Sequence, residues 1–332
     1  MRCPDLHELP VPLSERKGWP WTEGSPRLSL SNLPRISIIV PSYQQGSFLE
    51  ETLRSILLQG YPDIEIVLVD GGSTDETLRV IERYASWISW WVSEKDRGQT
   101  HALNKGLEQV TGTWIGWQNS DDYYAPLAFA HAMKTVETHP EVDVIYGTVD
   151  YVDESSHFLA PNLDVQPLKW ENMLEHPCCS NQSLFFHRSV FDSSIRFNES
   201  RRHYMDWDLY CHLVMAGKKF AYIPEIKGAF RQHAMAKSSK SIPIADAEAF
   251  EMQTWLLKSA LPQDIKEKIL EAMKHGCLND FGKQRFPLFR QHVRQWLCLG
   301  GWQKKPGRII IRYFASFLGA KGVRRCKQLF LR

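Results

Sequence analysis

Two adjacent carboxylates, Asp121 and Asp122, follow the apolar run that ends at Trp117, in the segment WIGWQNSDDYYAP. Neighbouring like charges repel each other, and their removal from water is costly unless another group neutralises them. A bound cation would neutralise them, whereas exposure on a surface loop would leave them solvated. The strands and helices that position the two residues decide between a cation site and an exposed loop.

Polar residues also follow three other short apolar runs that are rich in β-branched side chains. Tyr43 follows the run RISIIV, Asp70 ends the run IEIVLVD, and Asp96 follows the run ISWWVS. Segments with helical periodicity separate these runs, and strands that alternate with helices predict parallel βαβ units. Ligands of such sheets bind beyond the carboxyl ends of the strands. We therefore expect an α/β fold in which these polar residues meet at one edge of the sheet.

The predicted elements alternate regularly from residue 35 to residue 153. Strands are expected at residues 35–40, 64–70, 88–93, 113–118 and 142–153. The two helices between the first three strands each begin with a serine and a glutamate in capping-box spacing, Ser47 with Glu50 and Ser73 with Glu76. Beyond residue 155 the pattern predicts a strand and helix over 180–191, a helix over 206–215, two strands over 218–233, and helices from 242 onward.

Four motifs occur in a fixed order: IIVPSYQQGSFLEETLRSIL, VLVDGGSTDET, SEKDRGQTHALNKGL and GWQNSDDYYAP. Together they resemble the motifs of family 2 glycosyltransferases with the GT-A fold, and the likeness covers about residues 35–240. The resemblance implies a Rossmann-like, mostly parallel sheet flanked by helices. It also implies an inverting transfer of a sugar from a nucleotide-diphosphate donor to an acceptor, with the help of Mg²⁺ or Mn²⁺.

The resemblance assigns the residues at the strand ends to the nucleotide-sugar donor. Asp70 is expected to accept a hydrogen bond from an imide N–H of the base, although a turn at a helix N-terminus explains it too. This favours a UDP-sugar, but thymine presents the same imide and guanine also offers an N–H. Gly71 stands where the family usually has a second aspartate. The other residues expected at the donor are Pro41 and Ser42 along the pocket, Tyr43 stacked on the base, Asp96 and Arg97 closing on the nucleotide, and Asn119 and Ser120.

By the same resemblance, Asp121 is the metal ligand of an Asp-x-Asp motif in which Asn119 replaces the first aspartate. Mg²⁺ and Mn²⁺ prefer oxygen ligands, and the phosphates of the donor complete the set that one or two carboxylates begin. His233 lies in the segment FRQHAMAKSS, which resembles a loop after the last strand, and is a second candidate ligand. Asn119 lowers the charge of the site, which keeps open a catalytically weak relative that only binds nucleotide-sugar.

An inverting transfer also needs a carboxylate that takes the proton of the acceptor. The segment HYMDWDLYCHL resembles the family stretch that carries this base, which makes Asp206 the expected base and Asp208 the second choice. The alternative is that both only complement the dipole of the helix that they begin. Arg231 and Lys237 are expected to meet the diphosphate, and Gln182 to line the acceptor side.

The charge of the chain is unevenly distributed. From residue 281 to residue 332 there are 13 Lys and Arg and no Asp or Glu, although the whole chain of 332 residues carries only +2. Such a basic tail, interleaved with Trp and Phe, favours peripheral contact with an anionic membrane surface. A basic helical bundle is the alternative, and no nucleic-acid motif accompanies the charge.

The predicted organisation is an extended arm over residues 1–34, a catalytic domain over 35–240 and a helical, basic extension over 241–332. Seven cysteines without zinc-ligand spacing favour reduced thiols in a cytoplasmic protein on the inner face of the membrane. We expect a hexosyltransferase that acts on a glycan or lipid-linked acceptor in cell-surface polysaccharide synthesis. A nucleotidyltransferase is the alternative, but no Gly-rich phosphate loop with a lysine follows the first strand.

Overall fold

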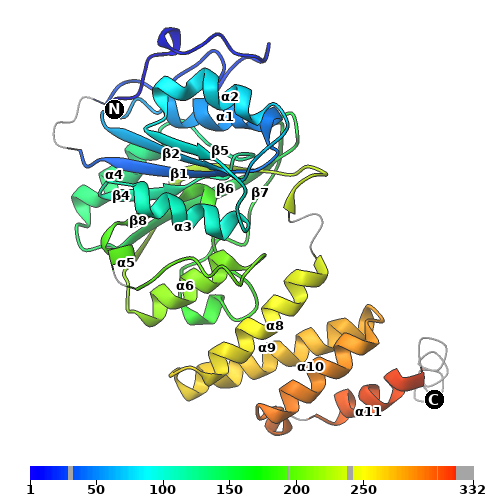
Figure 1. The fold of residues 1–332 in the computed structure, drawn as a ribbon. Coiled ribbons are helices and arrows are strands. Elements are labelled where there is room, and N and C mark those ends of the chain that lie inside the picture. Colours follow the sequence, from blue (N-terminus) through cyan, green and yellow to red (C-terminus); the bar gives the residue numbers. More distant parts are fainter. Residues whose placement is uncertain (29–32, 193, 238–241, 305, 319–332) are drawn as a thin grey trace. The chain divides into compact units, whose positions relative to one another are not determined.

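The computed structural model describes residues 1–28, 33–192, 194–237, 242–304 and 306–318. The chain divides into two compact units, each of which is described by itself. Unit 1 comprises Met1–Lys169 and Pro177–Lys240, and unit 2 comprises Trp170–His176 and Ser241–Arg332. Unit 1 is an α/β unit built on one sheet, and the described part of unit 2 is helical (Figure 1).

Among the described residues, nine strands form a single mixed sheet in the order β3-β2-β1-β4-β8-β6-β9-β5, with β7 paired to β6. The α/β class predicted from the sequence is confirmed. The strands are β1 (Ile36–Ser42), β2 (Ile64–Asp70), β3 (Trp90–Ser93), β4 (Trp114–Trp117), β5 (Tyr123–Tyr124), β6 (Val144–Val152), β7 (Phe158–Pro161), β8 (Leu184–His187) and β9 (Phe220–Arg231).

The first four strands are parallel, as the βαβ pattern predicts. Every residue of β1 and β2 is buried, which explains why their sequences are continuous apolar runs without alternation. Their register places Ser42 opposite Asp70, and Asp70 opposite Ser93, so the carboxyl ends of three strands lie in one row. The polar residues beyond these ends therefore meet at one edge of the sheet.

The rest of the sheet is more antiparallel than the sequence pattern predicts. Strand β8 pairs antiparallel with both β4 and β6, while β9 runs parallel to β6 and antiparallel to β5. The two strands expected over 218–233 are one long strand, β9, whose register against β6 shifts between Tyr146 and Thr148. At this shift Gly147 lies so close to the backbone of β9 that a Cβ would be 2.0 Å from the carbonyl oxygen of Ile226.

The helices of unit 1 lie where the sequence predicts them, but the predicted capping boxes are wrong. Helix α1 begins at Gly46, before Ser47, and helix α2 begins at Thr77, after Glu76. The start of α1 is instead capped from the start of α2, because Thr77 Oγ1 accepts a hydrogen bond from the N–H of Gln45 (3.1 Å). The helices are α1 (Gly46–Leu57), α2 (Thr77–Tyr84), α3 (Gln99–Gln109), α4 (Ala128–Thr138), α5 (Ser189–Asp192) and α6 (Met205–Met215).

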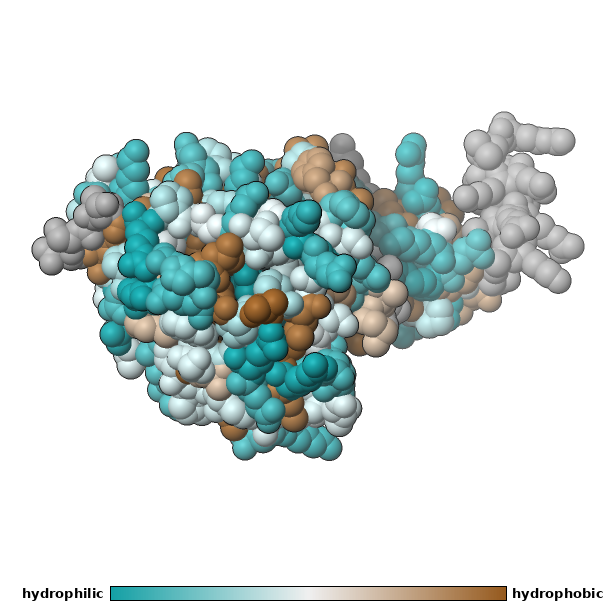
Figure 2. All heavy atoms as spheres, turned by 90° about the horizontal axis from the view of Figure 1, so that it is seen from above, coloured by the Kyte–Doolittle hydropathy of each residue, from teal (hydrophilic) through white to brown (hydrophobic). Residues whose placement is uncertain are grey.

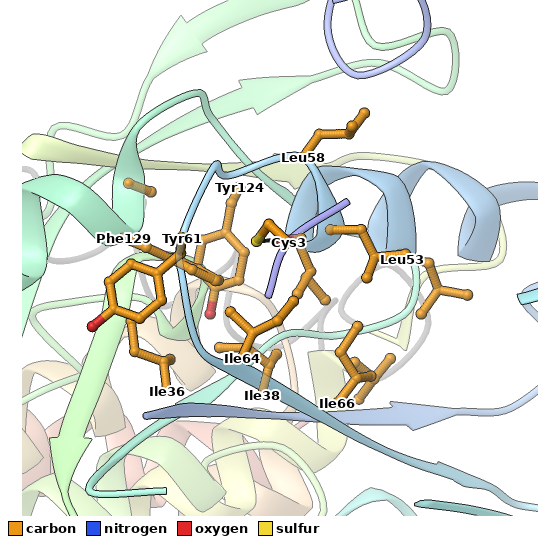
Figure 3. Close-up of a cluster of buried hydrophobic side chains, with 14 of the residues drawn as sticks. Cys3, Ile36, Ile38, Leu53, Leu58, Tyr61, Ile64, Ile66, Tyr124 and Phe129 are labelled. Carbon is orange, nitrogen blue, oxygen red and sulfur yellow. Dashed lines mark hydrogen bonds between the residues drawn. The ribbon is translucent and has the colours of Figure 1, made fainter. Parts of the chain in front are cut away.

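The arm of residues 1–28 packs against the rest of unit 1. Cys3 lies in the hydrophobic core beside Leu58 and Tyr61, among side chains from β1, β2 and α1 (Figure 3). The guanidinium of Arg54 on α1 is buried and donates hydrogen bonds to the carbonyl oxygens of Pro10, Pro20 and Trp21. On the face of the molecule in Figure 2, hydrophobic side chains form small groups among hydrophilic ones.

The described part of unit 2 contains α8 (Ile242–Lys258), α9 (Gln263–Gly282), α10 (Phe286–Cys298), α11 (Gly307–Ala315) and the short 3₁₀ helix η6 (Ser316–Leu318). Buried apolar residues of α9 and α10, such as Met273, Phe289 and Trp296, form its core. Within the described residues, no helix combines the length and apolar character that crossing a membrane requires.

Candidate functional site

A cavity of about 340 Å³ lies beyond the carboxyl end of β4. Its polar lining includes the turn after β4 with Asn119, Asp121 and Asp122, and Asp206 at the first turn of α6. Aromatic side chains of β6, β9 and the segment before α6 line another part of it. The cavity thus joins the predicted metal motif to the predicted base, although 84 residues of chain separate Asp122 from Asp206.

Asp121 is the more accessible of the two adjacent carboxylates. Its Oδ2 lies 3.0 Å from Nε2 of His233 and accepts a weaker hydrogen bond from Nε2 of Gln45 at 3.3 Å. His233 is buried and packs against the ring of Phe48, with ring centroids 4.7 Å apart. The structure therefore brings together the two residues that the sequence nominated as metal ligands, from loops 112 positions apart.

Asp122, in contrast, is buried and serves the internal structure of the turn. Oδ1 accepts a hydrogen bond from the backbone N–H of Arg231 (2.9 Å), and Oδ2 accepts from Gln182 Nε2 (2.7 Å) and Asn119 Nδ2 (3.0 Å). Burial and the neighbouring charge of Asp121 raise the pKa of Asp122 far above the ordinary range of a carboxyl group. A cation near Asp121 would relieve this repulsion.

Gln182 is fully buried and does not line the cavity, so this geometry does not support the acceptor contact predicted for it. Its amide nitrogen holds the carboxylate of Asp122 instead. The residue lies in the short 3₁₀ helix η4 (Asn181–Ser183), which β9 approaches closely at Gly228. Gln182 therefore supports the turn that contains Asp121 and Asp122.

The guanidinium of Arg231 is also buried and engaged. Nη2 forms an ion pair with Glu51 (2.7 Å), Nε donates to the carbonyl oxygen of Asp121 (2.8 Å), and Nη1 donates to Ser156 Oγ (2.8 Å). The group also lies over the rings of Phe48 and Tyr123. A guanidinium with these partners holds the turn in place, so the diphosphate contact predicted for Arg231 is not supported by this geometry.

Gln99, which was not among the residues predicted from the sequence, connects Asn119 to Lys237 by hydrogen bonds. Oδ1 of Asn119 accepts hydrogen bonds from Trp117 Nε1 (2.8 Å) and Gln99 Nε2 (2.7 Å). Oε1 of Gln99 accepts from the exposed Lys237 Nζ at 3.0 Å. Lys237 therefore lies at the cavity, as its predicted contact with a diphosphate requires, and Gln99 at the start of α3 connects it to the turn.

Asp70 is buried at the end of β2, where its carboxylate organises the following turn. Oδ2 accepts from the backbone N–H groups of Gly72 and Ser73 and from Ser93 Oγ, and Oδ1 accepts from Ser73 Oγ. These bonds match the turn role that the sequence left as the alternative to base recognition. Ser42 and Ser120 are also buried at this edge.

Two residues of the predicted donor site, Tyr43 and Asp96, lie together beside Gly71. A Cβ at Gly71 would be 3.0 Å from Oδ2 of Asp96 and 3.2 Å from Cδ2 of Tyr43. The ring of Tyr43 is exposed, as stacking on a base requires. Arg97 is exposed and forms an ion pair with Glu199 through Nε (2.9 Å) and Nη2 (2.7 Å).

The two candidate bases lie in different surroundings. Asp206 lines the cavity, and its Oδ1 accepts a hydrogen bond from the backbone N–H of Trp207. Asp208 is buried outside the cavity lining and contacts Asn198, Arg201 and His212. Burial alone would raise the pKa of Asp208. The interactions with His212, Asn198 and Arg201 lower the pKa by more than burial raises it, so the pKa lies below the ordinary value.

The aromatic lining of the cavity was not predicted. Tyr151 of β6 and Phe230 of β9 pack edge to face with centroids 5.7 Å apart, and His203 packs against Tyr204 at 4.8 Å. Rings placed in this way offer flat apolar surfaces beside polar groups, an arrangement that suits a sugar. Their positions in the sequence carry no motif, because strand pairing alone brings Tyr151 next to Phe230.

The protein side chains at this site can hold a hard divalent cation only if a bound molecule, such as a diphosphate, contributes further oxygen atoms. No group of three or more His, Cys, Asp or Glu side chains in the described parts of the chain is arranged to hold a metal. One accessible carboxylate and one imidazole, Asp121 and His233, face each other at 3.0 Å. Mg²⁺ and Mn²⁺ are commonly bound by one or two protein groups together with phosphates and water, so these residues fit such an ion.

Comparison with known proteins adds evidence on the family and the fold. Residues 37–192 match the family model described as glycosyl transferase family 2. A PGL/p-HBAD biosynthesis glycosyltransferase from Mycobacterium tuberculosis is 32% identical over 180 residues, which cover 53% of this chain and 68% of that protein. Chondroitin synthase from Escherichia coli is 26% identical over 226 residues, which cover 68% of this chain and 33% of that protein.

Two solved structures share the fold. TarS from S. aureus in complex with UDP-GlcNAc has a TM-score of 0.58 at 17% identity and covers 80% of this chain and 79% of its own. A mannosyltransferase from Pyrobaculum calidifontis in complex with GDP-Man and Mn²⁺ has a TM-score of 0.52 at 20% identity, with 86% of this chain and 77% of its own covered. The mixed α/β architecture of unit 1 is thus that of GT-A glycosyltransferases.

Proposed function

Because this chain belongs to glycosyltransferase family 2, we propose that it transfers a hexose, with inversion, from a nucleotide-diphosphate donor to a glycan or lipid-linked acceptor. The observation that carries the proposal is the cavity that Asp121 and Asp206 line together, with His233 against Asp121. One side of this cavity has the chemistry to hold a diphosphate, and the other has a carboxylate that can take a proton.

The donor lies along the carboxyl ends of β1 to β4. Tyr43 stacks on the base, Asp96 reads an N–H at its edge, and Lys237 contacts the diphosphate from the loop after β9. A UDP-sugar is favoured because a carboxylate pairs with the imide N–H of uracil. The fold neighbour TarS was solved with UDP-GlcNAc, which supports a UDP-sugar by analogy of fold alone.

Asp121 and His233 would hold Mg²⁺ or Mn²⁺, which would stabilise the negative charge that develops on the leaving diphosphate. Asp122 does not bind the ion directly in this proposal. Its bonds to Arg231, Gln182 and Asn119 hold the turn so that the carboxylate of Asp121 faces the cavity. The Mn²⁺ in the mannosyltransferase structure supports metal use within the fold.

Asp206 removes the proton of the acceptor hydroxyl while that oxygen attacks the anomeric carbon. The bond from the anomeric carbon to the diphosphate oxygen breaks on the opposite face, so the configuration inverts. Tyr151, Phe230 and Tyr204 pack against the sugar ring and exclude water from the reacting atoms. Binding of the acceptor in the right orientation also speeds the reaction, because the two substrates no longer have to meet by diffusion.

Calorimetric titration with UDP, GDP, dTDP and CDP, each with and without Mn²⁺, tests the donor site directly. We expect one nucleotide to bind in a metal-dependent manner, and Asp121→Ala to abolish the metal dependence. Asp164→Ala, which removes an exposed carboxylate that lines no part of the cavity, is the matched control and should bind as the wild type does. Binding without metal, unchanged in Asp121→Ala, would instead support a catalytically weak nucleotide-binding relative.

The proposal also includes peripheral binding of the protein to an anionic membrane surface. Arg308, Ile311, Phe314 and Phe317 follow one another at three-residue spacing along α11 and η6, and all four side chains are exposed. We name this set the α11 stripe. A helix with exposed aromatic residues and positive charge is suited to the interface of an anionic bilayer. Residues 319–332, which complete the predicted basic tail, lie outside the described residues.

A further inference from the structure

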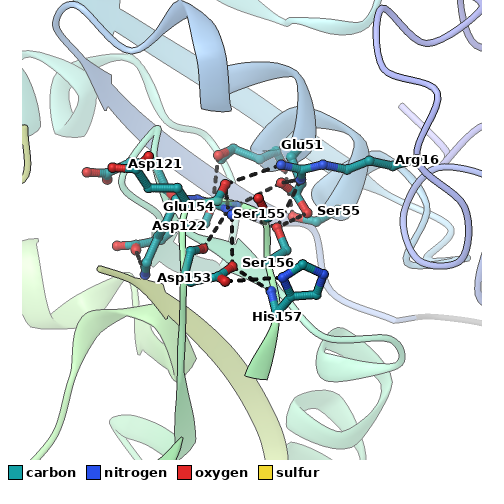
Figure 4. A network of polar contacts seen from close by, with 12 residues as sticks. Arg16, Glu51, Ser55, Asp121, Asp122, Asp153, Glu154, Ser155, Ser156 and His157 are labelled. Carbon is teal, nitrogen blue, oxygen red and sulfur yellow. Dashed lines mark hydrogen bonds and ion pairs between the residues drawn. The ribbon is translucent and has the colours of Figure 1, made fainter. Parts of the chain in front are cut away.

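We infer that Arg16, in the N-terminal arm, is a positioning residue for the metal turn at Asp121 and Asp122. The family model begins at residue 37, so the arm lies outside the matched region. The inference rests on the proposed function only where it names this turn a metal site. The contacts that carry it form one network, which Figure 4 shows from close by.

Arg16 and Arg231 share the same three acceptors. Nη1 of Arg16 donates to Glu51 Oε2 (2.7 Å) and Ser156 Oγ (3.0 Å), and Nη2 donates to the carbonyl oxygen of Glu154 (3.2 Å). Arg231 donates to the same three oxygens at 2.7, 2.8 and 3.0 Å. Two guanidinium groups thus enclose a carboxylate that is itself buried on α1.

Arg231 extends this network to the metal turn. Its Nε donates to the carbonyl oxygen of Asp121, and its backbone N–H donates to the carboxylate of Asp122. The path from the arm to the carboxylates therefore has two buried links, Glu51 and Arg231, whose side chains are 3% and 0% exposed. Groups so well packed have few alternative positions, so a change at one end shifts the other.

The charges explain why the second arginine matters. Glu51 and Arg231 alone would form a neutral buried pair beside two carboxylates. Arg16 adds one positive charge to the cluster and occupies acceptors on the loop 153–156, which borders the surface hollow that also contains His233. Without Arg16, Ser156 and the carbonyl oxygen of Glu154 each lose one donor, while their bonds from Arg231 remain and no longer compete with a second guanidinium. Residues that bond to metal-binding residues in this way orient them and tune their affinity for the metal.

The arm does not depend on Arg16 for its attachment. Cys3 and Trp21 are buried, Arg54 holds three carbonyl oxygens of the arm, and the N–H of Cys3 donates to the carbonyl oxygen of Tyr61 at 2.8 Å. Removal of the Arg16 guanidinium should therefore leave the arm in place. This separates a positioning role from a role in folding.

The test compares Arg16→Ala, Arg16→Lys and the control Arg27→Ala. Arg27 lies in the same arm but pairs with Asp5 and Glu8 of the arm itself. Hydrogen exchange of the ligand-free proteins should be faster in residues 118–124 of Arg16→Ala than in the wild type, and unchanged there in Arg27→Ala. Arg16→Lys should recover part of the protection, because an ammonium can pair with Glu51 but cannot reach all three acceptors.

A second readout is the affinity for UDP in the presence of Mn²⁺, which should fall by about tenfold in Arg16→Ala while the affinity without metal stays the same. Exchange in residues 118–124 that is unaffected in Arg16→Ala, with the arm still protected, would overturn the inference. A wild-type protein that binds no nucleotide with metal would overturn the proposed function, whereas the exchange result would still decide the role of Arg16.

Discussion

Asp206 and Asp208 are two residues apart at the start of α6, yet their side chains lie in different surroundings. The side chain of Asp206 faces the cavity, whereas that of Asp208 is buried among Asn198, Arg201 and His212. The two positions are about half a helical turn apart, so their side chains point in nearly opposite directions. Substitutions at the two positions should therefore have different effects.

We expect Asp206→Asn to lower kcat by about 10²–10⁴-fold, since a general base contributes a factor of this size. The affinity for UDP should stay close to that of the wild type, because the base does not contact the nucleotide. Steady-state kinetics and calorimetry on the same preparations measure both quantities. Asp208→Asn is the matched comparison, and a loss of kcat in Asp208→Asn with full activity in Asp206→Asn would transfer the role of base to Asp208.

Asp208 should instead affect stability, with a defined dependence on pH. The pKa of Asp208 is lowered, so its contribution is present above the ordinary aspartate pKa and is lost as the pH falls. A hydrogen bond to Asp208 raises the pKa of His212, so that contribution is present below the ordinary histidine pKa and is lost as the pH rises. Both contributions are complete between about pH 4 and pH 6.5.

The difference in free energy of unfolding between the wild type and Asp208→Asn should therefore be largest in this window. Urea denaturation of both proteins at a series of pH values measures it. A difference that stays constant from pH 4 to pH 9 would show that the pairing with His212 contributes nothing to stability.

At the scale of elements, the metal turn depends on a close approach between β9 and η4. A Cβ at Gly228 would lie 2.2 Å from the backbone oxygen of Gln182, whose side chain holds Asp122. Backbone atoms cannot give way as a flexible side chain can, so any larger residue must separate the two elements. Gly276 in α9 differs, because no atom lies within 4 Å of the position where its Cβ would be.

We expect Gly228→Ala to lower the free energy of unfolding by about 3 kcal/mol, the upper range for an overpacked core. Gly276→Ala is the matched control and should raise stability by about 0.5–1 kcal/mol, because alanine loses less conformational freedom in a helix. Thermal unfolding followed by circular dichroism measures both. Equal melting temperatures for the wild type and Gly228→Ala would mean that β9 and η4 can separate without cost.

At the scale of the whole molecule, charge divides the chain into an acidic part and a basic part. The first 280 residues carry a formal charge of −11, and the remaining 52 carry +13. Opposite signs at two ends of one chain allow one part to bind an anionic surface while the other keeps an acidic site for a cation. Screening by salt weakens such binding at the surface.

We expect the protein to bind vesicles that contain an anionic lipid and to bind phosphatidylcholine vesicles weakly. The double variant Phe314→Ser and Phe317→Ser in the α11 stripe should bind the anionic vesicles about tenfold more weakly, because each ring loses apolar contact with the interface. Leu163→Ser, at an exposed leucine of unit 1, is the control. Flotation at low and high salt measures the binding, and equal binding to both kinds of vesicle would contradict an electrostatic contribution.

The sequence by itself determined the alternation of strands and helices up to β6 and the edge at which polar residues meet, and it nominated Asp121 and His233 separately as metal candidates. These follow from local periodicity and from motifs whose residues are close together in the chain. Only the tertiary structure decided that Asp121 faces His233, that Gln182 and Arg231 support the turn of Asp121 and Asp122, that α2 caps the start of α1, and that Tyr151 lies beside Phe230. Each of these depends on partners distant in the sequence, for which burial and hydrogen-bond geometry leave no local pattern.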